Sequence, residues 1–227
     1  MNFAPDFQAI QPVPFQAMVG PLPTEPATQA RDQAGEKARR AFIARAHRRR
    51  VASLREAADA LDQLPEEGET LHAIMTGLYD LMHLLVVLLD RFGSRCEVLR
   101  VATLSLSARN VQEMVSLIDA GKVRRLDLLT SDFFQKHERE IFAELVKEFG
   151  ERGQRVAAAR SHCKVVTMAL RDGRRYVLEG SANLRTNRNL EQFALTRGPE
   201  LHRFYDTWLA RLVNAHEIRP TDHPQTS

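Results

Sequence analysis

Cysteine is scarce in this sequence, and its placement excludes two classes of small protein. Two cysteines, Cys96 and Cys163, cannot build a disulfide framework. Neither a C-x-x-C pair nor an H-E-x-x-H motif occurs, so the usual sequence signals for bound zinc are missing. The cysteine content is therefore typical of a protein from a reducing compartment.

Long hydrophobic runs are missing as well. The longest uninterrupted apolar run, residues 84–89, is far too short to span a bilayer. Residues 1–20 carry no basic segment and are interrupted by Pro5, Pro12 and Pro14, which argues against a secretory signal. We therefore expect a cytoplasmic protein without stable insertion into a membrane.

Composition and proline placement predict how the chain is divided. With 227 residues, 44% of them hydrophobic, the chain is large enough for one α/β core. Six of the 10 prolines precede residue 27, which predicts a flexible, proline-rich tail over residues 1–35. We expect a helical extension with a basic arm over 36–92, an α/β domain over 93–214 and a C-terminal tail over 215–227.

Hydrophobic periodicity predicts the elements. The apolar density of residues 69–92 predicts a helix buried against a sheet or a partner subunit. Beyond Gly93, short apolar strands alternate with amphipathic helices, which predicts an α/β fold with a mixed, mostly parallel sheet flanked by helices. The expected strands are 98–106, 126–130, 155–159, 162–170, 175–179 and 192–196, and the expected helices of this domain are 110–120, 137–149 and 199–213.

Positive charge is concentrated in one segment. Residues 37–55 contain eight lysines and arginines and no acidic residue, a local field that attracts polyanions such as nucleic acid or an anionic membrane surface. A solvated helix face or a disordered arm would have the same composition. The candidate nucleic-acid-binding residues are Arg45, Arg48, Arg49 and Arg50.

The predicted strand 162–170 begins with two chemically useful side chains. His162 and Lys164 are two residues apart, so they project from the same face of a strand. Burying an imidazole beside an ammonium is costly, and the like charges repel when the histidine is protonated. The pair therefore favours a neutral, nucleophilic ring, and a phosphate between the two groups would remove the cost. The alternative is that His162 is an ordinary packed or surface histidine without a catalytic role.

The following predicted strand ends in a second polar group. Gly180, Ser181 and Asn183 form a G-S-x-N sequence, in which a glycine lets the backbone approach a ligand closely while amides, a hydroxyl and a carboxamide donate hydrogen bonds. The same sequence also occurs as a plain turn. Further along the chain, Glu191 supplies a carboxylate that would hold His162 in one tautomer if it lay near the ring.

The order of these motifs resembles that of the phospholipase D superfamily, whose signature is H-x-K followed by G-S-x-N and often a later glutamate. The resemblance covers roughly residues 98–213 and is closest to the single-motif, phage and bacterial nuclease-like branch. One position departs, because Ala169 stands where the family has an aspartate. The matching residues are His162, Lys164, Gly180, Ser181, Asn183 and Glu191.

The resemblance implies a phosphodiesterase that works without metal or cofactor. Because this chain has one H-x-K motif, a homodimer would supply the second, and residues 69–92 are a candidate for part of the contact. One His162 would form a phosphohistidine while His162 of the partner subunit protonates the leaving oxygen. Lys164, Ser181 and Asn183 would neutralise the phosphoryl oxygens, and Glu191 completes the implied catalytic set.

The basic segment favours nucleic acid, DNA above all, as the partner and makes a nuclease the first hypothesis. No aromatic platform interleaved with basic residues is evident, so base-specific readout has no support. Three alternatives remain open. They are a lipid phosphodiesterase, a catalytically inactive phosphate-pocket protein that binds DNA or a partner, for which Ala169 is the support, and a merely structural polar network.

Overall fold

A computed structural model describes residues 55–75, 79–185 and 189–219. The chain divides into two units, Met1–Ala44 and Arg45–Ser227, and all described residues belong to the second. The predicted tail and the candidate residues Arg45, Arg48, Arg49 and Arg50 lie outside the described residues.

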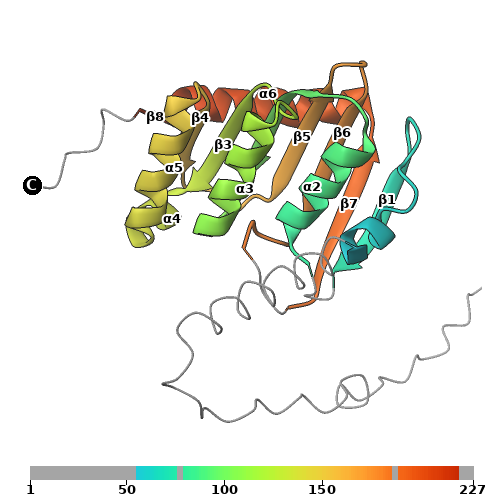
Figure 1. Cartoon of the computed structure of the whole chain (residues 1–227), viewed down its shortest axis with the longest axis horizontal. Coiled ribbons are helices and arrows are strands. Elements are labelled where there is room, and N and C mark those ends of the chain that lie inside the picture. Colours follow the sequence, from blue (N-terminus) through green and yellow to red (C-terminus); the bar gives the residue numbers. More distant parts are fainter. Residues whose placement is uncertain (1–54, 76–78, 186–188, 220–227) are drawn as a thin grey trace, which may run out of the picture. The chain divides into compact units, whose positions relative to one another are not determined.

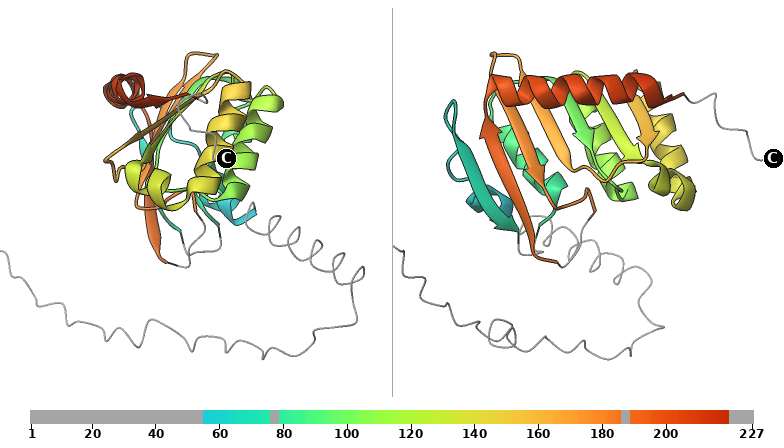
Figure 2. Two further views of the ribbon diagram at one scale, coloured as in Figure 1. Left: turned by 90° about the vertical axis from the view of Figure 1, so that its left-hand side faces the viewer. Right: turned by 180° about the vertical axis from the view of Figure 1, so that it is seen from behind.

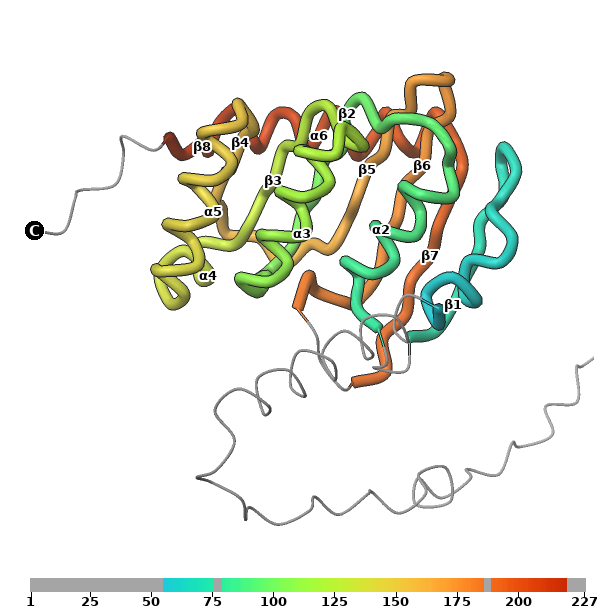
Figure 3. The backbone as a smooth tube through the Cα atoms, viewed as in Figure 1, coloured from blue at the N-terminus to red at the C-terminus, as the bar shows by residue number. Residues whose placement is uncertain are grey.

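In the described part of the chain, eight strands form one sheet of order β1-β7-β6-β5-β2-β3-β4-β8 (Figure 1). β1 and β8 lie at its opposite edges, as the tube view also shows (Figure 3). The strands are β1 (Thr70–Met75), β2 (Cys96–Ala102), β3 (Leu126–Ser131), β4 (Arg155–Ala159), β5 (Val165–Leu170), β6 (Arg175–Gly180), β7 (Glu191–Arg197) and β8 (Glu217–Ile218).

The α/β class and the mixed sheet are confirmed, but the expectation of a mostly parallel sheet is wrong. Only β2, β3 and β4 are mutually parallel among the described strands, and every other neighbouring pair is antiparallel. The connections explain the difference. Helices join the parallel strands, whereas among the described residues no helix stands between β5 and β6 or between β6 and β7, and these consecutive strands pair antiparallel.

Helices cover both faces of the sheet. α2, α3 and α5 lie on one face, and α6 runs across the strands on the other (Figure 2). Alternation along the strands separates two cores, since Leu99 and Val101 join the large core while Ala102 joins a smaller one beneath α6. The helices are α2 (Leu81–Arg91), α3 (Ala108–Asp119), α4 (Asp132–His137), α5 (Arg139–Glu151) and α6 (Pro199–His216). None of the helices among the described residues combines the length and apolar content that a membrane span requires.

The prediction of one helix over residues 69–92 is wrong in its first part, where strand β1 pairs with β7. Leu71 and Ala73 are partly buried against the core, and they alternate with exposed His72 and Ile74. This period of two is typical of a strand, but the apolar run that follows it in sequence conceals it.

The second part of that segment is the helix α2, and its apolar side is covered within this chain. Asp80 caps the helix by accepting a hydrogen bond from the backbone N–H of His83 at 3.1 Å. Seven apolar side chains of α2 are buried in the large core. The alternative of burial against the sheet is therefore confirmed, and these side chains are not available for the dimer contact that we expected of them.

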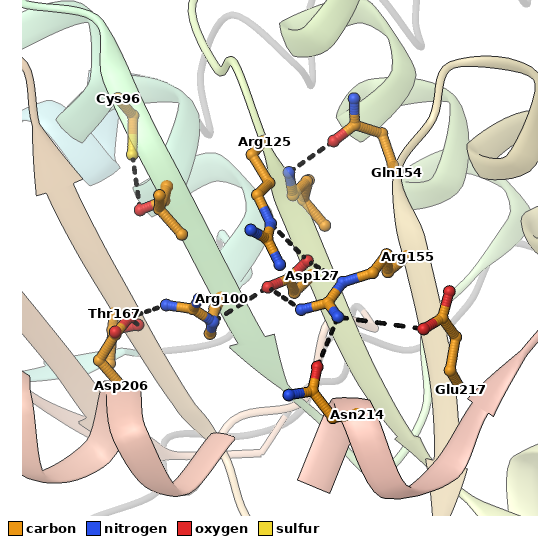
Figure 4. A network of polar contacts seen from close by, with 12 residues as sticks. Cys96, Arg100, Arg125, Asp127, Gln154, Arg155, Thr167, Asp206, Asn214 and Glu217 are labelled. Carbon is orange, nitrogen blue, oxygen red and sulfur yellow. Dashed lines mark hydrogen bonds and ion pairs between the residues drawn. The ribbon is translucent and has the colours of Figure 1, made fainter. Parts of the chain in front are cut away.

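A buried carboxylate lies in the sheet beneath α6 (Figure 4). Asp127 is fully buried and accepts hydrogen bonds from Arg100 at 3.0 Å, Arg125 at 3.1 Å and Arg155 at 2.8 Å. Burial opposes its ionisation, but the hydrogen bonds from Arg155 and Arg125 outweigh burial and hold the pKa of Asp127 below its usual value. The carboxylate therefore stays charged and paired.

Two of these arginines extend the network to α6. Arg100 donates to Asp206, and Arg155 donates to Asn214 at 2.6 Å. Both acceptors lie on α6, so the network fixes this helix across the strands. Its orientation matters for function, because two aromatic side chains of α6 reach the site described below.

Candidate functional site

Two connections of the sheet meet at one end of its strands, and this edge carries the sequence-predicted site residues. Because β5 begins where its antiparallel neighbour β6 ends, Val165 pairs with Glu179 at this edge. His162 and Lys164 precede β5, Ser181 and Asn183 follow β6, and Glu191 begins β7. The carboxyl ends of the parallel strands β2, β3 and β4 lie at the same edge, a place where α/β proteins commonly bind ligands.

His162 and Lys164 lie side by side. Lys164 Nζ is 3.0 Å from His162 Nδ1, and it also donates to the His162 carbonyl oxygen at 3.0 Å. His162 is exposed and Lys164 is half-buried. The strand begins three residues later than we predicted, at Val165, because residues 160–164 cross from β4 to β5 over the ends of β3 and β2. The pair therefore stands in the connection and not within the strand.

The electrostatics of the pair depend on burial and on one carboxylate. Burial lowers the pKa of the Lys164 ammonium below its usual value, while the charge of Glu191 opposes that shift. A charged Lys164 donates to Nδ1 of His162, so the proton of a neutral imidazole resides on Nε2.

Ser181 is fixed to the start of β7. Its hydroxyl donates to the Glu191 carboxylate, while its backbone N–H donates to the Gln192 carbonyl at 3.1 Å. The Gln192 N–H donates to the Ser181 hydroxyl oxygen at 3.1 Å. Glu191 is therefore linked to the site through Ser181, and a hydrogen bond from His162 to this carboxylate stays a prediction.

Asn183 is oriented by the end of β2. Its Oδ1 accepts a hydrogen bond from the Leu104 N–H at 3.3 Å, which leaves Nδ2 as the donor end of the carboxamide. The next residue, Leu184, is fully buried, and its carbonyl accepts from Asn110 Nδ2 at 2.8 Å. These contacts hold the G-S-x-N loop against the body of the domain.

At Gly180 the backbone of β6 comes close to another strand, and the approach to a ligand that we expected stays a prediction. A Cβ at this position would lie 2.5 Å from the Gln192 carbonyl oxygen and 3.3 Å from Phe193 Cβ. The close approach is thus to the backbone of β7, and a glycine permits it. The glycine allows β6 and β7 to stay paired up to the residue that carries the Ser181 hydroxyl.

An open cleft of about 680 Å³ on the α6 side brings part of the predicted set together. Asn183 and Glu191 line another, smaller pocket together with Arg185 and Asn189. Three predicted residues, His162, Lys164 and Ser181, share the large cleft. The large cleft is lined by His72, His162, Cys163, Lys164, Val165, Glu179, Gly180, Ser181, Gln192, Ala194, Tyr205 and Trp208.

Sequence reasoning missed the far wall of this cleft. Tyr205 and Trp208 are three residues apart on α6 and so project from one side of the helix. The Tyr205 hydroxyl donates to Glu179, and this hydrogen bond together with burial raises the pKa of Tyr205 to about 12. The spacing was visible in the sequence, but nothing local indicated that α6 crosses the strands at this edge.

Two further observations concern the chemistry of the site. Ala169 is buried in β5, where it pairs with Val98 and Arg175, so a methyl group occupies the position of the family aspartate. Among residues 55–75, 79–185 and 189–219, no group of three or more histidine, cysteine, aspartate and glutamate side chains is placed to hold a metal ion.

Comparison with known proteins gives similarity in structure only. The sequence matches no protein-family model and no curated protein. A solved structure of Nuc from Salmonella typhimurium, a phospholipase D family member, has a TM-score of 0.49 at 15% identity, over 66% of this chain and 98% of that one. NucT from Helicobacter pylori has a TM-score of 0.45 at 13% identity, over 66% and 99%.

A third structure is phosphatidylserine synthase from Haemophilus influenzae, with a TM-score of 0.47 at 18% identity. The similarity covers 69% of this chain and 41% of the synthase, so this chain spans less than half of that protein. The chain is thus similar in structure to a phospholipase D family member, the family that its H-x-K and G-S-x-N motifs resemble.

Proposed function

We propose that this protein is a phosphodiesterase whose nucleophile is His162. The observation that carries the proposal is the contact of His162 with Lys164 at the mouth of a cleft that Ser181 also lines. An exposed imidazole can reach a phosphorus atom, and the adjacent ammonium attracts the phosphate that the imidazole would attack.

The reaction needs two steps. In the first, a ring nitrogen of His162 forms a bond to phosphorus, the bond from phosphorus to the leaving oxygen breaks, and an acid protonates that oxygen. In the second, water attacks phosphorus, the nitrogen–phosphorus bond breaks, and a base accepts the proton of the water. Lys164 would neutralise the phosphoryl oxygens in both steps. The Ser181 hydroxyl would join it after releasing the Glu191 carboxylate, and Asn183 Nδ2 after turning from its separate pocket toward the large cleft.

One histidine cannot be nucleophile and acid in the same step, so the proposal includes a homodimer with a shared site. The attacking ring needs a nitrogen without a proton, whereas the acid must be a protonated ring, an imidazolium. The two rings would therefore hold different protonation states, with His162 of the partner subunit as the imidazolium in the first step.

Because α2 is covered within the chain, another surface must make the dimer contact. Ile74 is 68% exposed and Leu190 is 75% exposed. Ile74 pairs in register with Gln192, and Leu190 directly precedes Glu191, so both lie at the strand ends that carry the site. These two side chains are the part of the surface that we propose for the dimer contact.

Nucleic acid is the substrate class that we propose, and the observation that favours it is the basic segment 37–55. Arg45, Arg48, Arg49 and Arg50 would bind several phosphates of a long polyanion at once, a gain that a small diester does not offer. A lipid phosphodiesterase is the second candidate, and an inactive DNA-binding protein is the third.

The test is incubation of the purified full-length chain with plasmid DNA, RNA and phosphatidylcholine vesicles in the presence of EDTA. His162→Ala protein, whose change removes an exposed side chain and spares the core, serves as the control. We expect nucleic acid to be cut by the unaltered protein alone. Cleavage confined to the vesicles supports the lipid candidate, and nucleic-acid binding without any cleavage supports the inactive one.

A further inference from the structure

A second open cleft, of about 590 Å³, meets the first at His162. It lies over the carboxyl ends of β2, β3 and β4, and its volume falls in the range of roughly 300–1,000 Å³ typical of ligand pockets. Its lining residues are Leu104, Ser131, Asp132, Phe133, Arg160, Ser161 and His162. A phosphodiester has an organic group on each side of its phosphorus. Because His162 lines both clefts, a phosphate bound at His162 could place one organic group in each cleft.

Phe133 gives this second cleft a flat aromatic wall. The side chain is 56% exposed, whereas its neighbour Phe134 is fully buried and anchors the short helix α4. The Phe133 ring stacks on the ring of His137, with the centroids 4.0 Å apart and the planes at 23°. Phe133 therefore presents an exposed aromatic ring to the cleft, stacked on a second ring.

Positive charge accompanies the ring. Arg160 directly follows β4, is exposed and lines the same cleft. Exposed Lys136 lies on α4 and forms an ion pair with Asp132 at 3.6 Å. An aromatic face beside cationic side chains is the arrangement with which proteins bind single-stranded nucleic acid, because the ring stacks a base and the cation contacts the phosphate.

We propose that Phe133 is a base-stacking residue for a single-stranded nucleic acid whose reacting phosphate lies at His162. This inference rests on the proposed function, and it adds the substrate form and the position of one nucleotide. The strand would lie across His162, with one flanking nucleotide on Phe133 and Arg160 and the other in the cleft lined by Tyr205 and Trp208. Stacking tolerates any base, so the preference would be for single strands and not for a sequence.

The aromatic platform escaped sequence reasoning for a definite reason. Phe133 and His137 are four residues apart, a spacing that brings side chains together only on a helix. We expected the helix of this region to begin at residue 137, so the two rings were not expected to meet. The separate six-residue helix α4 places them in contact.

The test compares three variants of the full-length chain on two fluorescent single-stranded oligonucleotides. One oligonucleotide carries bases throughout, and the other has abasic residues on both sides of a single cleavable phosphate, with every other linkage made resistant. The variants are Phe133→Ala, Phe133→Trp and, as the matched control, Phe204→Ala. Phe204 is 66% exposed on α6 and lines neither cleft, and its ring contacts Tyr205 edge-to-face, with the centroids 5.1 Å apart.

We expect Phe133→Ala to lower kcat/KM for the base-containing strand about tenfold, within roughly 5- to 150-fold. The abasic strand should be cut equally by Phe133→Ala and the unaltered chain, Phe133→Trp should restore cleavage, and Phe204→Ala should have no effect. An equal loss on both strands, or no loss, overturns the stacking role while the phosphodiesterase stands.

Binding of the same strands, measured by fluorescence anisotropy, separates the two proposals. Binding that depends on Phe133 and on the bases, without cleavage, supports the stacking role and contradicts the phosphodiesterase. Absence of binding to both strands overturns the stacking role, as does a loss in Phe133→Ala that is confined to the cleavage of phosphatidylcholine vesicles.

Discussion

Lys164 Nζ lies 3.0 Å from Nδ1 of His162, so the ammonium contacts one ring nitrogen and leaves Nε2 without this contact. This contact gives Lys164 two roles in the proposed reaction. The ammonium attracts the phosphate, and its hydrogen bond to Nδ1 orients the His162 ring. A lysine without a phosphate-binding site nearby would have no need of either role.

Replacing Lys164 by methionine keeps the length of the side chain and removes the charge. We expect cleavage of a single-stranded oligonucleotide to fall by on the order of a hundredfold or more, because the phosphoryl oxygens lose a charged donor. The melting temperature should change little, since the ammonium is half-exposed and makes its described contacts only to His162. Cleavage at the unaltered rate would contradict the role of Lys164.

Replacing Ile74 and Leu190 together by glutamate tests the proposed dimer contact. Both side chains are largely exposed in the single chain, so we expect the fold to persist while like charges separate the subunits. Sedimentation should show a shift from dimer to monomer, with cleavage lost in parallel. Phe204→Glu is the matched control. A monomeric double variant that still cleaves at the full rate would contradict the shared site.

Replacing Gly180 by alanine tests the strand contact beside the site. The added methyl group would lie 2.5 Å from the Gln192 carbonyl oxygen, so β6 and β7 must separate. We expect a loss of about 1–3 kcal/mol in the free energy of unfolding, together with reduced cleavage, because Ser181 moves. Gly198→Ala is the control, since its methyl group would lie at an ordinary 3.8 Å from Thr196. Equal stability of the two variants would refute this account.

His202 should make the stability of the domain depend on pH. Burial lowers its pKa to about 4, an effect that Asp206 opposes and the charges of Arg175 and Arg100 reinforce. In the unfolded chain the histidine has its ordinary pKa of about 6.5, so between the two pKa values the unfolded chain binds a proton that the folded chain does not bind. The contribution of His202 to the free energy of unfolding is therefore fully present above pH about 6.5. It falls on acidification toward pH about 4, by up to ~1.4 kcal/mol per pH unit.

The measurement is urea denaturation of the unaltered chain and of His202→Gln at several pH values between about 4.5 and 7. This window lies above the ordinary pKa of aspartate, about 3.9, so the paired carboxylate of Asp127 contributes little change there. We expect the glutamine variant to show a flatter dependence on pH. Identical slopes for the two proteins would contradict the assignment to His202.

Local patterns in the sequence predicted many of the elements but not the arrangement of the sheet. The strand expected over residues 155–159 is found as β4, because its apolar residues lie between clear turn signals. The pairing of β1 with β7 joins Thr70 to Thr196, which are 126 residues apart, and no local pattern records it. We expected a mostly parallel sheet because helices alternate with strands in the sequence, but this alternation does not say which strands are neighbours.

The same distinction holds for the site. The contact of His162 with Lys164 follows from residues two apart in an extended segment, although we placed that segment inside the strand. Tyr205, Trp208 and Phe133 line the clefts because of where α6 and α4 pack, which depends on tertiary structure. Such neighbours cannot be predicted from spacing alone.

The central claim is that a nitrogen of His162 becomes bonded to phosphorus. The structure offers a rival nucleophile in the Ser181 hydroxyl, which donates to Glu191. The direct measurement is alkaline quenching of the protein during cleavage of a single-stranded oligonucleotide in EDTA, followed by digestion and mass spectrometry of the adduct. We predict a phosphoramidate on His162 that acid removes. An acid-stable adduct on Ser181, with cleavage retained by His162→Ala, would contradict the account.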